Sequence, residues 1–367
     1  MKSHTFSLLL LQKVGILTWC LLLAILFGVV TLHFLGLING WLFPVRGVIT
    51  FLGGAGIACF IISFLLGRIT KKWLIYSSLF LAFIVNLFAF LGAYSLTHYQ
   101  TEGTWGLGIP RPQNMRSPAD IGLEFFTQNI PIGSDKWLEI WQIPAAFSRG
   151  TVILFPGQGV AKGKQLLAPA EIFHTLNYDT VLVDYQGVGG SSGNKTTIGA
   201  KEAKDVEAVM AYVQKIHPDR PIILYGISMG SAAILRAIAQ EKVQPDVIII
   251  EMPFVRLLDA VKIRLKTAKI PSFPFAELLV FWGSVQHGFN GFTYNPVIYA
   301  KQVNCPTLLM QGEKDKWVTL QEIQELFNNL NGSKQLMMLP NTGHELLVSL
   351  DREQWYENVQ QFLLKFS

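Results

Sequence analysis

The chain has 367 residues, of which 50% are hydrophobic and only 15% are charged. Soluble globular proteins carry about 25% charged residues, so this composition argues against an ordinary soluble protein. None of the 25 acidic residues precedes Glu102, whereas six of the 30 basic residues do. The net charge of +5 therefore comes from the start of the chain, and the nearly neutral remainder lacks the basic stripe of a nucleic-acid-binding protein.

The N-terminal arm, residues 1–100, is expected to form three membrane-spanning helices, near 14–38, 47–67 and 73–96. These windows contain no Asp, Glu, Lys or Arg. A helix of about 20 residues crosses the hydrocarbon core of a bilayer, which is roughly 30 Å thick. No small-residue cleavage site follows the first apolar run, so we expect a signal anchor instead of a cleaved signal peptide.

Basic residues predict the orientation of this arm. Lys2 and Lys13 precede the first expected span, and Arg68, Lys71 and Lys72 separate the second from the third. Because cytoplasmic loops are enriched in Lys and Arg, the N-terminus is expected in the cytoplasm. An odd number of spans then places the downstream domain outside the cytoplasm, in the periplasm if the protein is bacterial.

The three cysteines predict neither a disulfide nor a metal site. Cys20 and Cys59 fall inside expected spans, and Cys305 is alone in the downstream region. The sequence has no Cys-x-x-Cys pair or Cys/His cluster of the kind that binds zinc. We therefore expect no metal and no organic cofactor.

A stretch rich in Gly and Pro, residues 101–119, is expected to link the arm to one α/β domain at 120–367. Short runs that are apolar on both faces alternate there with amphipathic patterns. This alternation is typical of a parallel sheet covered on both sides by helices. The expected strands are 123–130, 137–143, 151–155, 180–184, 221–225, 247–250, 307–310 and 335–339, and the expected helices are 163–176, 198–216, 229–240, 319–330 and 351–365.

The motif Gly226-x-Ser228-x-Gly230 comes between the strand 221–225 and a helix of small residues. A serine hydroxyl is a weak nucleophile unless a base removes its proton. A tight strand-to-helix turn would expose the Ser228 hydroxyl at the sheet edge, and the flanking glycines leave room for that turn. We therefore predict that Ser228 is a nucleophile and not a structural turn serine.

His344 and Asp315 are the expected partners of this serine. His344 follows the last apolar run, whereas the other six histidines lie in the arm, in or beside helices, or in an aromatic insertion. Asp315 follows the strand 307–310 and would fix the imidazole tautomer and stabilise the imidazolium. Glu251, at the end of the preceding strand, stays open as an alternative acid.

Two backbone N–H groups are expected to stabilise an oxyanion. Preorganised donors of this kind each contribute about 3 kcal/mol of transition-state stabilisation. One is the Met229 N–H, at the start of the helix after Ser228, and the other is the Gln158 N–H, in the turn 156–159. The alternative interpretation of 156–159 is a turn without a catalytic role.

These motifs together resemble the alpha/beta hydrolase superfamily, especially its membrane-anchored serine-aminopeptidase-like and esterase/lipase-like members. The resemblance covers about 120–367 and leaves the arm out. It implies a mostly parallel eight-stranded sheet with helices on both faces, a small cap, and a Ser-Asp-His triad. The chain departs from the family pattern at Pro156, where His is usual, and at Gln186, where Arg is usual. The matching segments are Phe155-Pro156-Gly157-Gln158, Asp184-Tyr185-Gln186-Gly187-Val188-Gly189-Gly190-Ser191 and Glu251-Met252-Pro253-Phe254, of which the second is implied to support the site.

An insertion at about 255–299 is expected to form the cap. It is basic at first and then aromatic, so it fits a helical lid with its own core. It also fits a cap that lines an apolar acyl pocket near lipid headgroups, and both interpretations can hold at once. The basic residues are Arg256, Lys262, Arg264, Lys266 and Lys269, and the aromatic ones are Phe273, Phe275, Phe281, Trp282, Phe289, Phe292 and Tyr294.

The resulting hypothesis is a membrane-anchored serine hydrolase that cleaves a carboxylic ester or related acyl bond of an apolar or lipid-like substrate. Serine peptidase, aminopeptidase-like and thioesterase activities stay open, and so does a non-catalytic binding or scaffold domain of the same fold. A dinucleotide site at Gly157-x-Gly159-x-x-x-Gly163 is disfavoured, because its spacing departs from the usual fingerprint. The expected partners are the bilayer and a small acyl substrate, and no nucleic acid.

Overall fold

The computed structural model describes residues 71–101 and 107–366. The spans expected at 14–38 and 47–67 lie outside the described residues. The third expected span coincides with a helix, α3 (Lys71–Thr97). Among the residues that the structure describes, no helix is both long enough and apolar enough to cross a membrane.

The chain forms two compact units. The larger unit, Ala93–Gly283 and Asn290–Ser367, contains the whole sheet. The smaller unit includes Ser284–Phe289, where the Gln286 side-chain amide donates a hydrogen bond of 2.8 Å to the Phe90 carbonyl.

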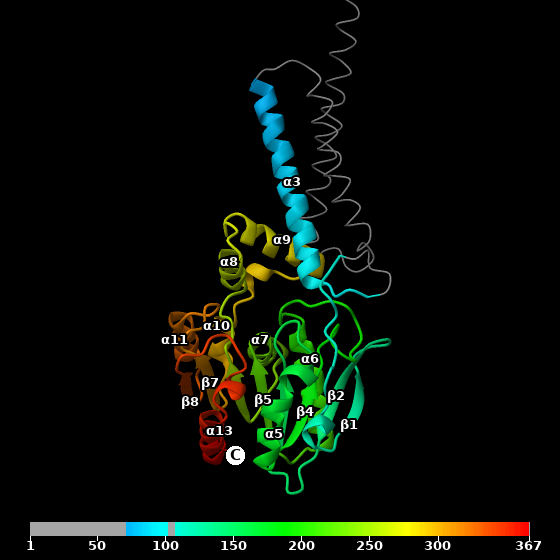
Figure 1. The fold of residues 1–367 in the computed structure, drawn as a ribbon, viewed down its shortest axis with the longest axis vertical. Helices are drawn as coiled ribbons and strands as arrows, with labels where there is room; N and C mark the ends of the chain where they lie inside the picture. Colours follow the sequence, from blue (N-terminus) through cyan, green and yellow to red (C-terminus); the bar gives the residue numbers. More distant parts are fainter. Residues whose placement is uncertain (1–70, 102–106, 367) are drawn as a thin grey trace, which may run out of the picture. The chain divides into compact units, whose positions relative to one another are not determined.

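The sheet has eight strands in the spatial order β1-β2-β4-β3-β5-β6-β7-β8 (Figure 1). β1 and β2 form an antiparallel hairpin, β2 is antiparallel to β4, and every other neighbouring pair is parallel. The expected mostly parallel, eight-stranded sheet is therefore confirmed. The strands are β1 (Phe126–Pro131), β2 (Trp137–Ile143), β3 (Thr151–Phe155), β4 (Asp179–Val183), β5 (Ile222–Ile227), β6 (Val247–Glu251), β7 (Thr307–Gly312) and β8 (Lys334–Leu339).

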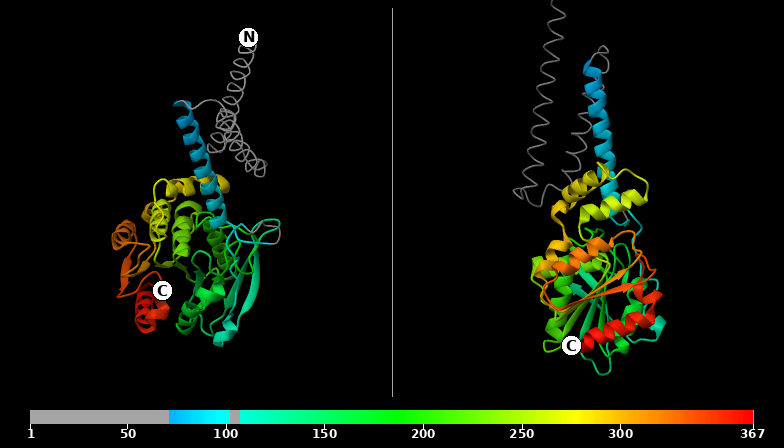
Figure 2. Two further views of the ribbon diagram at one scale, coloured as in Figure 1. Left: turned by 45° about the horizontal axis from the view of Figure 1, so that its top comes forward. Right: turned by 90° about the vertical axis from the view of Figure 1, so that its left-hand side faces the viewer.

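Helices cover both faces of the sheet (Figure 2). Apolar side chains of α5 (Leu167–Thr175) and α13 (Arg352–Phe366) share one core with the strands. The opposite face carries α6 (Glu202–Ile216), α7 (Met229–Arg236) and α11 (Leu320–Asn329). The remaining short elements are η1 (Pro118–Ile121), α4 (Lys162–Gln165), η2 (Ala237–Glu241), η4 (Ala300–Gln302) and α12 (Leu347–Leu350).

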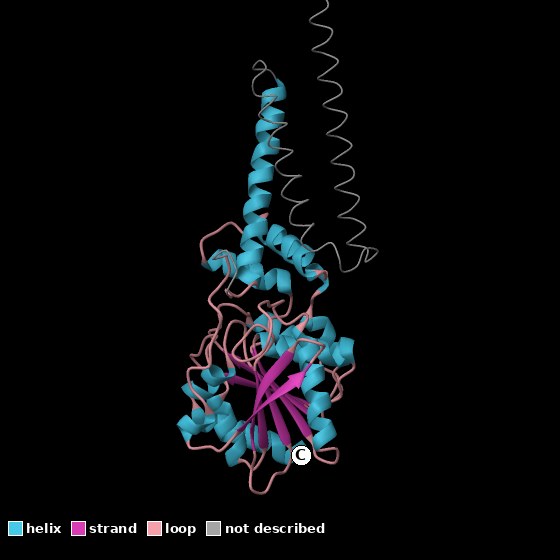
Figure 3. Ribbon diagram, turned by 90° about the vertical axis from the view of Figure 1, so that its right-hand side faces the viewer, coloured by secondary structure: helices cyan, strands magenta, loops and turns pink. Residues whose placement is uncertain are grey.

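The insertion between β6 and β7 is helical, as expected for a cap. It forms α8 (Leu257–Thr267), α9 (Phe275–His287), η3 (Gly291–Thr293) and α10 (Pro296–Tyr299). The loops that follow the parallel strands gather at the end of the sheet nearest to α8 (Figure 3). This is the edge at which sheets of this kind bind ligands.

Several elements differ from their expected bounds: β1 begins at Phe126 instead of 123, α7 ends at Arg236 instead of 240, and two further helices differ as follows. The helix expected at 163–176 is interrupted at Leu166 and forms α4 and α5. The helix expected from residue 198 begins at Glu202, because Ile198 and Gly199 have φ values of 58° and 94°, which a right-handed helix cannot contain. The Glu202 carboxylate accepts hydrogen bonds from the backbone N–H groups of Thr197 and Gly199, at 2.8 and 3.0 Å, and so holds this turn.

Trp355 ties the C-terminal helix to the sheet. Its ring is fully buried and makes edge contacts with Phe173 of α5 and Tyr225 of β5, with centroid separations of 5.5 and 6.1 Å. Such aromatic pairs add about 0.5–1.5 kcal/mol beyond the burial of their area. The indole N–H also donates to Glu251 Oε1 at 2.7 Å. The C-terminal helix α13 is therefore joined to the last residue of β6, Glu251.

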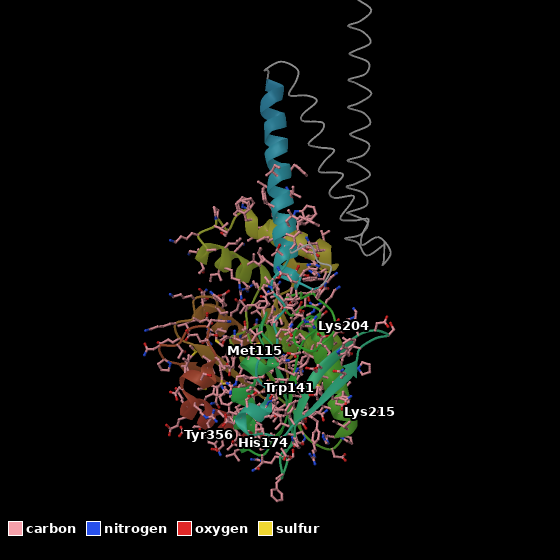
Figure 4. All side chains as sticks on the ribbon, turned by 45° about the vertical axis from the view of Figure 1, so that its right-hand side comes forward. Met115, Trp141, His174, Lys204, Lys215 and Tyr356 are labelled. Carbon is pink, nitrogen blue, oxygen red and sulfur yellow. The ribbon has the colours of Figure 1, made fainter. Side chains whose placement is uncertain are left out.

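A buried lysine, Lys162, joins β2 to the segment that follows β4. Lys162 of α4 is fully buried, and its ammonium group forms salt bridges with Glu139, at 2.7 Å, and with Asp184. The same group lies 4.3 Å from the ring centroid of Trp141, which is labelled in Figure 4. Asp184 also accepts a hydrogen bond of 2.7 Å from Asn114. Full pairing is what makes burial of these charges tolerable.

Replacing Lys162 should therefore destabilise the domain. We expect Lys162→Met to lower the free energy of unfolding by about 3–5 kcal/mol, because Asp184 would keep a buried charge without its counter-ion. Urea-induced unfolding of the purified full-length chain measures this. The exposed Lys164→Met is the matched control and should change the same quantity by less than about 0.5 kcal/mol. Equal stability of the two variants would contradict the role of Lys162.

Candidate active site

Ser228 lies in the turn between β5 and α7. Its backbone has φ 53° and ψ −106°, a sterically strained conformation, and its N–H donates to the Glu251 carbonyl at 2.7 Å. A Cβ atom at Gly226 would lie 2.6 Å from the backbone carbon of Gly230. A Cβ atom at Gly230 would lie 2.5 Å from the Phe155 carbonyl oxygen. Only glycines therefore fit on either side of the serine.

The structure brings Ser228, His344 and Asp315 into one line of hydrogen bonds. His344 Nε2 lies 2.9 Å from Ser228 Oγ, and His344 Nδ1 lies 2.7 Å from Asp315 Oδ2. Both distances are within hydrogen-bond reach of a general base and its orienting acid. With an N–H on Nδ1 directed at the carboxylate, Nε2 is left to accept the serine proton.

Asp315 is held as a carboxylate by several donors. Burial raises the pKa of the Asp315 carboxyl, but the hydrogen bond and charge of His344 and the N–H groups of Trp317 and Val318 outweigh it, so the pKa lies below its usual range. The two N–H groups donate at 2.7 and 3.1 Å, and the Gln311 amide donates at 2.9 Å. An ionised Asp315 can therefore face His344 at neutral pH.

Glu251, the alternative acid, has a different environment. Its carboxylate accepts hydrogen bonds from the Tyr225 hydroxyl and the Trp355 indole, both at 2.7 Å. Burial raises the pKa of the Glu251 carboxyl to about 7, against the opposing effect of these two hydrogen bonds. Of the two acids considered from the sequence, only Asp315 has a hydrogen bond to His344 among the described residues.

The two expected oxyanion donors lie on segments that touch. As the first residue of α7, Met229 has no intrahelical acceptor for its N–H. Gln158 lies in the turn after β3. Gly230, the residue after Met229, packs against the start of this turn: a Cβ atom at Gly230 would lie 2.5 Å from the Phe155 carbonyl oxygen and 2.9 Å from that of Pro156. The turn is fixed further by a hydrogen bond of 2.7 Å from the Gly157 N–H to the Gln165 side chain.

Sequence reasoning missed two residues beside this site. Trp317 packs against His344, with ring centroids 5.0 Å apart, and Lys162 holds the segment that follows the Gln158 turn. The position of Trp317 two residues after Asp315 was the available signal, whereas nothing in the local sequence marked Lys162 as buried. Among the described residues, no group of three or more His, Cys, Asp or Glu side chains could hold a metal ion.

Comparison with known families gives two matches. Residues 147–295 match the family described as serine aminopeptidase, S33. Residues 292–366 match the family described as PhoPQ-activated pathogenicity-related protein. The first match contains the Ser228 turn, and the second contains Asp315 and His344.

Curated relatives share about a quarter of the aligned residues. YqkD, an uncharacterised protein of Bacillus subtilis (strain 168), is 24% identical over 195 residues, which cover 52% of this chain and 64% of that protein. The lysophosphatidylserine lipase ABHD12 of Mus musculus is 23% identical over 205 residues, which cover 52% of this chain and 48% of that lipase. The chain thus spans less than two thirds of the length of either relative.

Solved structures share the fold. The Pyrococcus furiosus esterase Pf2001 has a TM-score of 0.59 and 22% identity, and the match covers 70% of this chain and 97% of the esterase. The alpha/beta hydrolase GrgF from Penicillium sp. sh18 has a TM-score of 0.53 and 18% identity, with 66% and 99% covered. Together with the eight-stranded sheet, these similarities show that the chain has the alpha/beta hydrolase fold.

Proposed function

We propose that the protein is a serine hydrolase that cleaves a carboxylic ester or a related acyl bond through an acyl-enzyme on Ser228. The observation that carries this proposal is the line of hydrogen bonds from Asp315 through His344 to Ser228, at 2.7 and 2.9 Å. Such a line supplies both the base that activates a serine and the acid that orients the base.

The proposed reaction has two halves. His344 removes the Ser228 proton while Oγ attacks the carbonyl carbon, and the Met229 and Gln158 N–H groups stabilise the oxyanion. The tetrahedral intermediate collapses, His344 gives the proton to the leaving alcohol, and an acyl group stays on Ser228. A water molecule, deprotonated by His344, then attacks this acyl group and releases the carboxylic acid and free serine.

The relatives favour an ester among the acyl bonds. One is named a lysophosphatidylserine lipase and one matched structure is an esterase, so an acyl ester with an apolar or lipid-like chain is the proposed substrate. The match to the serine aminopeptidase family keeps a peptide or aminoacyl amide as the second candidate. Comparing hydrolysis of an ester, a thioester and an amide of the same acyl group separates these activities.

We further propose that the arm anchors the hydrolase domain in a bilayer, with the domain outside the cytoplasm. The long windows without charged residues support the anchor, and the basic residues around them support the orientation. The segment between α8 and α9 exposes Ile270 and Phe273, at 43% and 76%, beside the exposed Lys266 and Lys269. Apolar and basic side chains together suit the surface of a bilayer that contains anionic lipid.

Asp315→Asn tests the proposed triad. We expect this variant to lower the turnover of an ester by about 10⁴-fold, because the amide would hold His344 in the wrong tautomer. Glu251→Gln is the control and should cost less than about tenfold, since the amide oxygen can still accept a hydrogen bond from Tyr225 or Trp355. Steady-state hydrolysis by both purified variants measures this. The reverse ranking would assign the role to Glu251.

Protease treatment tests the orientation. Protease added outside intact cells or spheroplasts should remove the 120–367 domain, because that domain is proposed to lie outside the cytoplasm. Immunoblotting of the remaining membrane-bound fragment measures this. Digestion that begins only after the membrane is opened would invert the orientation. Release of the intact protein by alkaline carbonate would contradict the anchor.

A further inference from the structure

Arg264 of the cap reaches the candidate active site through one aromatic ring. Its guanidinium carbon lies 4.9 Å from the ring centroid of Trp317. The Trp317 ring lies 5.0 Å from the His344 ring, and His344 Nε2 lies 2.9 Å from Ser228 Oγ. A positive charge therefore lies one aromatic ring away from His344, the group that would transfer the proton.

Arg264 differs from the neighbouring cap cations in its pairing. Arg256 forms a salt bridge with Glu325, and Lys262 forms one with Glu277 at 3.3 Å. Within the described residues, Arg264 has no salt bridge, and its hydrogen bond goes to the Ala260 carbonyl, at 3.0 Å in its own helix. A guanidinium has five N–H donors, and none of those of Arg264 donates to an acidic side chain among the described residues.

The surroundings make this lone cation costly without an anion. Partial burial lowers the pKa of Arg264, although the nearby Asp315 charge opposes the shift. Asp315 accepts hydrogen bonds from His344, Gln311 and the loop that follows, and it forms no salt bridge with Arg264 in the described part of the chain. A bound anion would offset this cost.

The side of the site on which Arg264 lies indicates which part of the substrate it meets. His344 gives its proton to the leaving alcohol, so groups stacked against His344 face the alcohol portion and not the acyl chain. Trp317 is 39% exposed and offers an apolar surface on the same side. The planar guanidinium fork matches the oxygens of phosphate and carboxylate groups.

We propose that Arg264 selects acyl esters whose alcohol portion carries a phosphate or carboxylate group. This inference rests on the proposed hydrolase function and narrows its substrate class. Arg264 binds the anionic group beside Trp317, while the acyl carbonyl lies at Ser228. Arg264 is therefore a specificity residue, and a neutral ester should be hydrolysed without its help.

Three oleoyl esters distinguish the possible anions: 1-oleoylglycerol is neutral, 1-oleoylglycerol 3-phosphate carries phosphate, and O-oleoyl lactate carries carboxylate. For the full-length protein, we expect Arg264→Gln to lower kcat/KM at least about tenfold for the anionic ester that the site prefers, because a charge-assisted hydrogen bond is lost. The same variant should change kcat/KM for 1-oleoylglycerol less than about threefold. Arg264→Lys should give an intermediate loss, because it keeps the charge without the fork.

Lys262→Gln is the matched control, since Lys262 lies two residues away in α8 and is paired with Glu277. It should leave the ratio of kcat/KM for anionic and neutral esters unchanged. An equal loss for all three esters in Arg264→Gln would overturn the assignment, because Arg264 would then only brace Trp317 and His344. A wild-type preference for the neutral ester would overturn it as well.

A binding measurement separates this inference from the proposed function. Ser228→Ala protein cannot form an acyl-enzyme, so its affinity for 1-oleoylglycerol 3-phosphate and O-oleoyl lactate can be measured by calorimetry. We expect Arg264→Gln in this background to weaken binding of at least one of them about tenfold or more. If the wild type hydrolyses none of the esters, the proposed function fails, whereas unchanged binding of both anions in the double variant refutes the role of Arg264.

Discussion

The hydrogen bond between His344 and Asp315 is the contact on which the proposed chemistry depends. At 2.7 Å it fixes which imidazole nitrogen carries the proton, and so leaves Nε2 free to face Ser228. Asp315 can serve this purpose because donors from Gln311 and the following loop hold it as a carboxylate. A neutral acid in the same place would give His344 no fixed tautomer.

The parallel sheet brings these three residues together. Ser228, Asp315 and His344 follow β5, β7 and β8, whose carboxyl ends share one edge. The sheet also explains why Glu251 is unsuited to the role although it ends the strand between β5 and β7. Its side chain is directed toward Tyr225 and Trp355, where it joins the sheet to the C-terminal helix.

The strands and the candidate site were accessible to sequence reasoning because each depends on local order. Apolar runs marked the strands, and the residues that follow them marked the edge at which Ser228, Asp315 and His344 meet. The choice between Asp315 and Glu251 was not accessible, because it depends on the direction of two side chains and on the packing of Trp355 from a helix about a hundred residues away.

Other features depend on contacts that no local pattern records. The local sequence around Lys162 is typical of an exposed helical residue. Its burial depends on salt bridges with Glu139 of β2 and with Asp184, which directly follows β4. The late start of α6 follows from positive φ values at Ile198 and Gly199. Isoleucine rarely adopts such a value, so the sequence did not indicate it. In the sequence, Arg264 is one of several basic residues of the cap, and only the structure shows that it contacts Trp317.

The central claim is that the line from Asp315 to His344 makes Ser228 a nucleophile. The most direct measurement is to mix the full-length protein with a long-chain 4-nitrophenyl ester, quench it with acid, and map the acylated peptide by mass spectrometry. The account predicts an acyl group on Ser228. Consumption of the ester with the acyl group on another residue, or with no covalent adduct at all, would contradict it.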